Sequence, residues 1–173
     1  SSDDGAKLDV DYILKGLEGS STVTIKTTSS GENLESGNIN FTVGLDYDGV
    51  GQSTLKLEAD NNIVFSSGVE ISDGDGSKDV LSIELNAGGE IRLLEDAIIN
   101  TQGGFFTVGN TITPTTFSNL GTIDTSGINV VIKPYDILKG TDGGDISINS
   151  NGGLTTGTLI SIGGKARNQV GLT

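Results

Sequence analysis

The chain of 173 residues contains no cysteine, histidine, methionine or tryptophan, and it has only two prolines. Without cysteine or histidine it cannot form disulfides, thiolate nucleophiles, the common zinc sites or the Ser-His and Cys-His catalytic groups. Chemistry based on carboxylate, lysine, serine or tyrosine remains open. Aromatic residues make up 5% of the chain, so aliphatic side chains must supply almost the whole hydrophobic core.

Basic residues are also scarce. Ten lysines and arginines face 23 acidic residues, which gives a formal net charge of −13. Such a chain repels nucleic-acid phosphates and anionic lipids. We therefore expect no nucleic-acid partner. We also expect no membrane insertion, because no apolar run approaches the roughly 18 residues of a membrane span and no signal-peptide pattern is present. The absence of methionine indicates that Ser1 is not a native start, and we expect a processed or excised piece of a longer protein.

The residues that are abundant predict an all-β protein. The 27 glycines, together with 34% hydrophobic residues, are typical of a globular chain. Apolar residues alternate with polar ones in short runs, which is the pattern of β-strands. The alternating residues are Val23 and Ile25; Ile39, Phe41 and Val43; Leu55, Leu57 and Ala59; Leu81, Ile83, Leu85 and Ala87; Phe106 and Val108; Ile146 and Ile148; Ile160 and Ile162.

The chain divides into an acidic lead (1–7), one domain (8–164) and a tail (165–173). Near the start of the domain, Val10, Ile13, Leu14 and Leu17 have helical spacing. They follow Asp9, which, like Asp11, is a suitable helix cap, so a helix of one or two turns is predicted there.

Three internal matches give one repeat length. Residues 54–71 align with 82–99 at an offset of 28, with apolar positions in phase. An isoleucine followed by a polar residue and a turn recurs at 71–73, 99–101, 123–125 and 148–150. Residues 13–16 (ILKG) recur at 137–140, and 23–25 matches 146–148 at an offset of 123. The common period is about 25 residues, and we read the offset of 123 as five such periods.

Short strands at this period predict a parallel β-solenoid, right-handed by the usual preference, with roughly seven coils. The alternative is an antiparallel sandwich, which would show no register between repeats. In the solenoid, one polar column would contain Asn100, Asp124 and Asn149, with Ser72 as its possible start. A neighbouring column would contain Thr101, Thr125 and Ser150, and Lys56 would pair with Glu84 across coils.

Several runs, taken in order, resemble the repeat region of filamentous-haemagglutinin-type exoproteins, which are exported by two-partner secretion. The runs are Leu8-x-Val10 to Gly16, Val23-Thr24-Ile25-Lys26-Thr27, Gly37-Asn38-Ile39, Leu55-x-Leu57-x-Ala59-x-Asn61-Asn62-Ile63 and Ile99-Asn100-Thr101-x-Gly103-Gly104. The likeness covers about residues 8–164. It implies a right-handed β-helix at the bacterial cell surface that acts in adhesion. The Asn-Pro-rich motif of the family's secretion domain is missing, which indicates an internal segment.

One acidic loop is a candidate calcium site. Asp73, Asp75, Ser77, Asp79 and Glu84 have the spacing of calcium-loop positions 1, 3, 5, 7 and 12. Lys78 replaces the glycine of the sixth position, so only weak binding by Asp73, Asp75 and Asp79 is predicted, and a solvated turn is the alternative. The smaller groups are Asp142 with Asp145 and Asp46 with Asp48.

Three other patterns have a functional and a structural interpretation. Arg92 beside Glu90, with Glu58 and Glu84 on neighbouring coils, suggests a polysaccharide-cleaving site or, alternatively, solubilising surface charge. The outward Thr22 and Thr24 could begin an ice-binding array, but Asn38, Asn40 and Lys56 would follow them. Gly163-Gly164-Lys165 is a poor match to a phosphate loop.

One segment breaks the period. Gly109 to Leu120 is either a partner-facing loop or a cover for the core through Ile112 and Phe117.

From these features we expect a non-enzymatic, extracellular β-solenoid segment of a large bacterial surface adhesin, which acts as a spacer and a binding surface and needs no cofactor beyond possible calcium. Its partner would be a cell-surface receptor, a carbohydrate or neighbouring copies of itself. One alternative is a filament subunit that docks head to tail, with Asp3 and Asp4 facing Lys165 and Arg167. A second alternative is a polysaccharide-acting β-helix enzyme.

Overall fold

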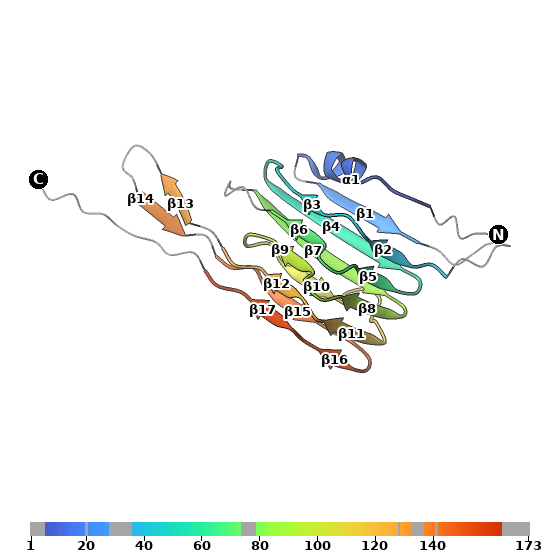
Figure 1. The fold of residues 1–173 in the computed structure, drawn as a ribbon. Coiled ribbons are helices and arrows are strands. Elements are labelled where there is room, and N and C mark those ends of the chain that lie inside the picture. Colours follow the sequence, from blue (N-terminus) through green and yellow to red (C-terminus); the bar gives the residue numbers. More distant parts are fainter. Residues whose placement is uncertain are drawn as a thin grey trace, which may run out of the picture.

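The computed structural model describes residues 6–19, 21–27, 36–73, 79–127, 129–132, 137–140 and 142–163. These residues form a β-solenoid with three parallel sheets, each five strands deep, and one helix at the N-terminal end of the stack (Figure 1). The predicted solenoid is confirmed. The antiparallel sandwich is wrong, because every neighbouring pair in the three large sheets is parallel. No helix in the described ranges has the length and apolar character needed to cross a membrane.

The chain visits the three sheets in turn. Sheet A contains β1 (Thr22–Lys26), β4 (Gln52–Ala59), β7 (Val80–Ala87), β10 (Phe106–Val108) and β15 (Ile146–Ile148). Sheet B contains β2 (Ile39–Phe41), β5 (Ile63–Phe65), β8 (Glu90–Leu93), β11 (Thr116–Asn119) and β16 (Leu154–Thr155). Sheet C contains β3 (Leu45–Asp46), β6 (Glu70–Ser72), β9 (Ile98–Asn100), β12 (Thr122–Asp124) and β17 (Thr158–Ile160).

The match at an offset of 28 is the register of two stacked coils. Leu57 lies beside Leu85 in sheet A, Ile63 beside Ile91 in sheet B and Ile71 beside Ile99 in sheet C. Because side chains alternate between the two faces of a strand, this register turns the matched apolar residues inward and the polar ones between them outward, although the outward Ser82 and Asn86 are buried too.

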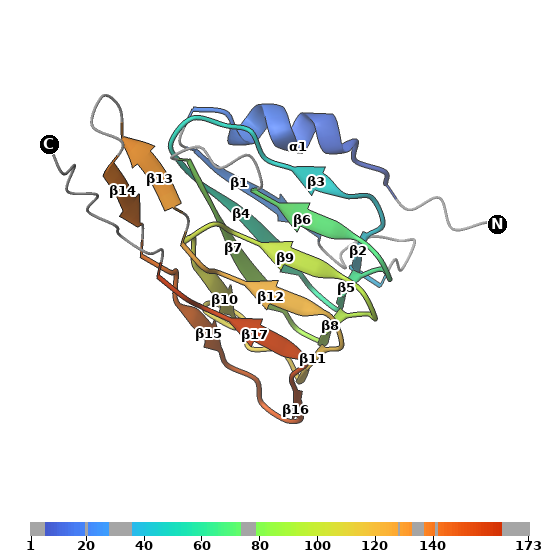
Figure 2. The same ribbon diagram turned by 60° about the vertical axis from the view of Figure 1, so that its left-hand side comes forward.

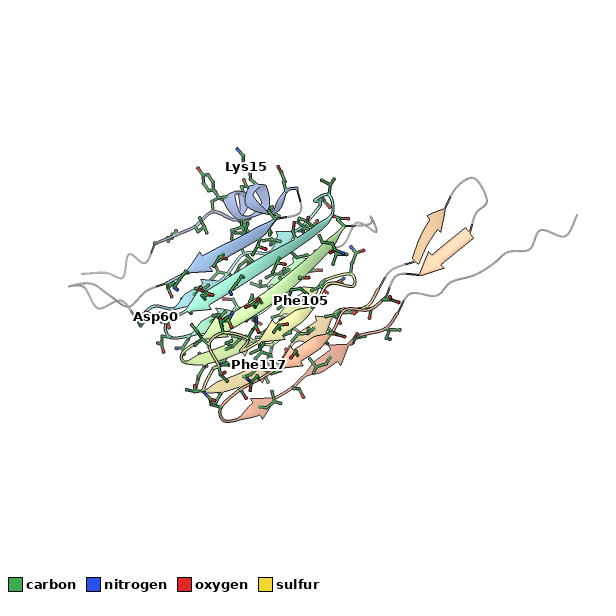
Figure 3. All side chains as sticks on the ribbon, turned by 180° about the vertical axis from the view of Figure 1, so that it is seen from behind. Lys15, Asp60, Phe105 and Phe117 are labelled. Atoms are coloured by element: carbon green, nitrogen blue, oxygen red, sulfur yellow. The ribbon has the colours of Figure 1, made fainter. Side chains whose placement is uncertain are left out.

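The core consists of apolar columns that run along the stack. The inward column of sheet A contains Val23, Leu55, Ile83, Phe106 and Ile146. Aromatic rings join the coils and the sheets: Phe41 stacks on Phe65 with centroids 5.5 Å apart, and Phe106 meets Phe117 at 6.3 Å. Figure 3 shows Phe117 among the side chains between the sheets. Three alternating positions are wrong: Val43 and Ile162 are exposed, and the register of β17 puts Leu159, not Ile160, in the inward column.

The expectation of roughly seven coils is not confirmed, because each parallel sheet has five strands among the described residues. The step between equivalent residues varies from 23, between Ile83 and Phe106, to 40, between Phe106 and Ile146. Dividing the chain length by 25 therefore gives too many coils. With a strand spacing of about 4.8 Å, the first and fifth strands lie roughly 19 Å apart. The match of 23–25 with 146–148 is real, but it spans four steps of sheet A rather than five.

The predicted helix is α1 (Val10–Leu17). Asp9 caps it, with its Oδ1 accepting a hydrogen bond from the backbone N–H of Asp11 at 3.1 Å. Ile13 and Leu17 are buried, and α1 lies across the N-terminal end of the stack beside β1 and β3 (Figure 2). Lys15 points away from the sheets in Figure 3.

The period is broken at a different place from the one predicted. Residues 116–119 of the segment Gly109 to Leu120 form the regular strand β11, and Phe117 covers the core, as the second interpretation of that segment expected. The irregular insertion is an antiparallel hairpin of β13 (Asn129–Ile132) and β14 (Ile137–Gly140), which projects from the stack between β12 and β15 (Figure 1). The ILKG match is therefore wrong as a repeat, since residues 13–16 are helical and 137–140 are a hairpin strand.

Candidate functional sites: the ion ladder and the polar corner

An ion ladder crosses the outer face of sheet A; it consists of Lys26, Lys56, Glu58 and Glu84. The predicted pair of Lys56 and Glu84 is confirmed, with Nζ and Oε1 3.1 Å apart. Lys56 also lies 3.0 Å from Glu58, which in turn lies 3.5 Å from the Nζ of Lys26. Since the strands are parallel and in register, residues from three successive coils meet here.

The ladder shifts the pKa of its members in the directions that favour the charged forms. Hydrogen bonds with Glu58 and then Glu84 raise the pKa of Lys56, and the hydrogen bond from Lys56 lowers the pKa of Glu58. Burial acts to raise the pKa of Glu84. Hydrogen bonds from Asn86, Lys56 and Asn110 outweigh burial, so the pKa of Glu84 is lowered overall.

The predicted grouping of Arg92 with Glu58 and Glu84 is wrong. Arg92 lies on β8 in sheet B, where its Nε is 3.7 Å from Glu90, whereas both glutamates lie on sheet A. The basic group between Glu58 and Glu84 is Lys56, which neutralises them. Strand alternation placed these side chains outside, but it could not show which sheet each strand joins.

The second candidate is the polar corner, the interior edge where each coil passes from sheet C to sheet A. We define it by Tyr47, Ser53, Asp73, Asp79, Thr101, Gln102 and Thr125, all of which are buried. Backbone hydrogen bonds between neighbouring coils fix its main column: the N–H of Tyr47 donates to Ser72, that of Asp73 to Asn100 and that of Thr101 to Asp124. A polar column therefore runs inside the solenoid beside the aliphatic ones.

This arrangement corrects the predicted columns. Ser72, Asn100 and Asp124 stack as expected, and the column begins one coil earlier at Asp46, whose Oδ1 accepts from Ser72 Oγ at 3.1 Å. Thr101 and Thr125 stack too, but inside the corner rather than on the surface.

Asn149 and Ser150 do not belong to these columns. They follow β15 in sheet A, and the hairpin insertion shifted the sequence match by one sheet.

Short hydrogen bonds hold most of the corner. The hydroxyl of Tyr47 donates to Ser53 Oγ at 2.9 Å, and Ser53 Oγ donates to the carbonyl of Leu17 at 2.6 Å. Thr101 and Thr125 donate to the carbonyls of Gly104 and Gly144 at 2.7 and 2.6 Å.

Glycine is required at Gly104 and Gly144. A Cβ atom on Gly104 would collide with the Leu81 carbonyl, and one on Gly144 would collide with the Gly104 carbonyl. The glycine pairs seen in the sequence therefore allow the coils to approach closely at this corner.

The candidate calcium residues Asp73 and Asp79 lie in the polar corner and are 0% and 3% exposed, so they do not belong to a solvated turn. Asp75 lies outside the described residues. Asp73 Oδ2 accepts from the N–H of Leu81 at 2.8 Å. Glu84, the predicted twelfth position, belongs to the ion ladder instead. The described part of the chain brings no three His, Cys, Asp or Glu residues together as a metal site, and calcium binding by Asp73, Asp75 and Asp79 stays a prediction.

The remaining candidates are placed as follows. Asp48, Asp142 and Asp145 are exposed. Thr22 and Thr24 lie beside Thr54 and Lys56, so the threonine array stops at Lys56, one of the residues expected to interrupt it, whereas Asn38 and Asn40 lie outside sheet A. Of the proposed phosphate loop, 164 and 165 lie outside the described residues, as do Asp3, Asp4 and Arg167.

Sequence reasoning missed Gln102 and the interior role of Tyr47. The available signal was their position: each falls one or two residues beyond a strand of sheet C, where an inward polar side chain meets the corner. Comparison with known proteins found no matching family model, no similar curated protein and no similar solved structure.

Proposed function

We propose that this chain is a non-enzymatic structural segment of an extracellular bacterial surface adhesin, where it acts as a spacer and presents a binding surface. The observation that supports the proposal is the register: three parallel sheets stack the same inward columns coil after coil, while the outward residues change freely. Such a molecule gains its stability from contacts between neighbouring coils, so its length and its outer surface can vary independently.

The outer face of sheet B supports the role of a binding surface. Four outward residues follow one another in neighbouring coils about 4.8 Å apart: Asn40, Val64, Arg92 and Ser118. They present an amide, an aliphatic, a cationic and a hydroxyl group in turn. These four side chains share no common chemistry, whereas the inward residues beside them are apolar with the exception of Asn119. A variable outer surface on a uniform core is typical of a display scaffold.

The test is binding of the labelled chain to a glycan array and to host cells, with release of sugar products measured in parallel. We expect saturable binding without products, and we expect Arg92→Glu to change it more than Lys15→Glu on the outer side of α1. Cleavage of a polysaccharide would contradict the proposal and favour the enzyme alternative. Absence of binding to every surface tested would also count against it.

A second candidate function, self-assembly, is favoured by the exposed last coil. Leu154 and Leu159 are 55% and 39% exposed, whereas their partners on the preceding coil, Phe117 and Ile123, are 1% and 0% exposed. Residues 146–163 contain no charged side chain, so a second copy of this acidic chain can approach without repulsion there. Unpaired strand edges are templates for pairing.

The geometry favours end-to-end dimers over head-to-tail filaments, because α1 covers the N-terminal end of the stack (Figure 2). We expect the mass measured by light scattering to rise with concentration to that of a dimer, and Leu159→Lys to keep the chain monomeric. Val43→Lys, a matched change at an exposed apolar residue of the first coil, should have no effect. Masses that climb beyond the dimer would favour the filament, and a monomer at all concentrations would refute self-assembly.

A further inference from the structure

The turn between β15 and β16 contains the one Asn-Gly dipeptide of the chain, Asn151-Gly152. This turn lies at the end of the stack opposite α1 (Figure 2), and both residues are exposed. Glycine is required after Asn151, because a Cβ atom on Gly152 would lie 2.6 Å from the carbonyl oxygen of Thr115 in the preceding coil. The close packing of two coils therefore places a glycine directly after an exposed asparagine.

Hydrogen bonds attach Asn151 to the preceding coil. Its backbone N–H donates to the carbonyl of Pro114 at 2.8 Å, and its Nδ2 donates to the carbonyl of Thr113 at 3.2 Å. Two residues later, the carbonyl of Gly153 accepts from the N–H of Phe117 at 3.1 Å. The side-chain amide of Asn151 therefore helps to hold the last coil against the one before it.

The backbone nitrogen of Gly152 is free to react. Its N–H makes no hydrogen bond within the described part of the chain, and glycine has no side chain that would shield the nitrogen. Because this nitrogen directly follows Asn151, its attack on the side-chain Cγ closes a small, favourable ring. Asparagine is among the thermally labile residues, and a following glycine makes it the most reactive.

We propose that Asn151 deamidates spontaneously in the folded chain and that the products loosen the attachment of the last coil. The nitrogen of Gly152 loses its proton to hydroxide and forms a bond to Asn151 Cγ, while the bond from Cγ to Nδ2 breaks and ammonia leaves with a proton from water. Water then opens the resulting succinimide ring. Cleavage between the ring nitrogen and Cγ gives aspartate. Cleavage between that nitrogen and the main-chain carbonyl gives isoaspartate, whose main chain is longer by one methylene group.

Both products remove the donor that Asn151 supplies to the preceding coil. An ionised carboxylate has hydrogen-bond acceptors only, so it repels the carbonyl oxygen of Thr113 instead of donating to it. Isoaspartate also lengthens the main chain next to Gly152, where the contact with Thr115 leaves no room. In addition, a negative charge appears within residues 146–163, which otherwise carry no charged side chain. The reaction is therefore a slow switch that acts in one direction, from an attached to a loosened last coil.

Peptide mapping tests the reaction. The full chain is incubated in mildly alkaline buffer and digested with trypsin, and the peptide of residues 140–165 is analysed by mass spectrometry against an unincubated sample. We expect the mass change of an amide NH₂ replaced by OH at Asn151, in an aspartate and an isoaspartate form, at a rate that rises with pH. Asn149, which a serine follows in the same peptide, is the internal control and should stay unmodified while Asn151 is half converted. An unmodified Asn151 in the folded chain, or equal conversion of both asparagines, would overturn the proposal.

Two variants locate the reaction. Asn151→Gln keeps the amide group, but its longer side chain would have to close a larger and less favourable ring, so we expect no conversion at this position. Asn149→Gln is the matched control and should leave the conversion of Asn151 unchanged. Ammonia release that continues in Asn151→Gln at the wild-type rate would place the reaction elsewhere and refute this site.

Hydrogen exchange tests the structural consequence. Asn151→Asp supplies one product by mutation, and incubated wild type supplies isoaspartate. In both samples we expect the amide of Phe117, which donates to the carbonyl of Gly153, to exchange faster than in fresh wild type, while the amides of β7 stay unchanged. Unchanged exchange at Phe117 in both samples would show that the last coil stays attached. Faster exchange throughout the stack would indicate global destabilisation instead of local release, and either result would refute the proposed switch.

Discussion

At the scale of single residues, adjacent side chains of similar chemistry have opposite roles. Phe105 is 40% exposed, whereas Phe106 is fully buried and meets the ring of Phe117. The alternation of β-structure explains the difference, because Phe106 has the inward parity of sheet A and Phe105 does not. Burial of the aromatic ring, rather than its presence, decides how much it stabilises.

We therefore expect Phe106→Ala to lower the free energy of unfolding by about 3–5 kcal/mol, through lost burial and the cavity left behind. Phe105→Ala is the matched control and should cost clearly less, because Phe105 is 40% exposed and its ring is not part of the core. Urea unfolding followed by circular dichroism measures both. Equal losses in the two variants would contradict the assigned register.

The ion ladder makes stability depend on pH in a calculable direction. The lowered pKa values of Glu58 and Glu84 mean that their contribution is present above the ordinary value of 4.5 and is lost as pH falls through the folded-state values. The raised pKa of Lys56 means that its contribution is present below 10.5 and is lost as pH rises through its folded-state value. The ladder therefore contributes fully between these limits.

Lys56→Gln should lower the free energy of unfolding by about 1 kcal/mol near pH 7, since it removes two partly screened ion pairs. The variant should also lose less stability than wild type when the pH is lowered from 5 toward 3. Lys26→Gln is the control, because Lys26 is mostly exposed and touches Glu58 alone in the ladder; its effect should be under about 0.5 kcal/mol. Identical pH profiles for wild type and Lys56→Gln would refute this account.

At the scale of elements, α1 covers the N-terminal side of the first coil, as the preceding coil covers that side of every later coil. Its inward residues Ile13 and Leu17 cover the end of the apolar stack, and the carbonyl of Leu17 accepts the hydrogen bond from Ser53. Repeat proteins need such a terminal cap, because the outermost coil otherwise leaves its core in water.

Leu17→Ala should accordingly cost about 2–5 kcal/mol, the range for a buried leucine. Tyr12→Ala on the exposed face of the same helix should cost less than about 1 kcal/mol. Thermal and urea unfolding of both variants decide the matter. If Leu17→Ala unfolds like wild type, α1 does not act as a cap.

At the scale of the whole molecule, stability should fall from the middle coils toward the coil of β15, β16 and β17, which no described residue covers on its outer side. The coil of β7, β8 and β9 has neighbours on both sides, whereas β15, β16 and β17 form an outer edge among the described residues. Native-state hydrogen exchange should therefore be slowest in β7 and β8 and faster by orders of magnitude in β16 and β17. Uniform protection across all coils would mean that the stack opens only as one unit.

The sequence alone predicted the features that depend on local alternation and on one clear repeat. Leu57 over Leu85, Ile71 over Ile99, the cap at Asp9 and the pair of Lys56 with Glu84 all follow from side-chain periodicity and charge. These features need no knowledge of distant parts of the chain. The alternation of side chains determines which face of the strand a residue occupies, and the offset of 28 residues determines its neighbour in the next coil.

Only the tertiary structure decided which sheet each strand joins. The hairpin of β13 and β14 lengthens the chain between β12 and β15, so Asn149 falls in sheet A rather than in sheet C, and no local pattern reveals this. Thr101 turns inward because it follows β9 at the polar corner. The polar corner depends on the same fact, because Asp73 and Gln102 are 29 residues apart and meet only through the stacking of two coils. Short-range preferences act within one strand. Which residues become stacked neighbours depends instead on the total length of the turns and insertions between them.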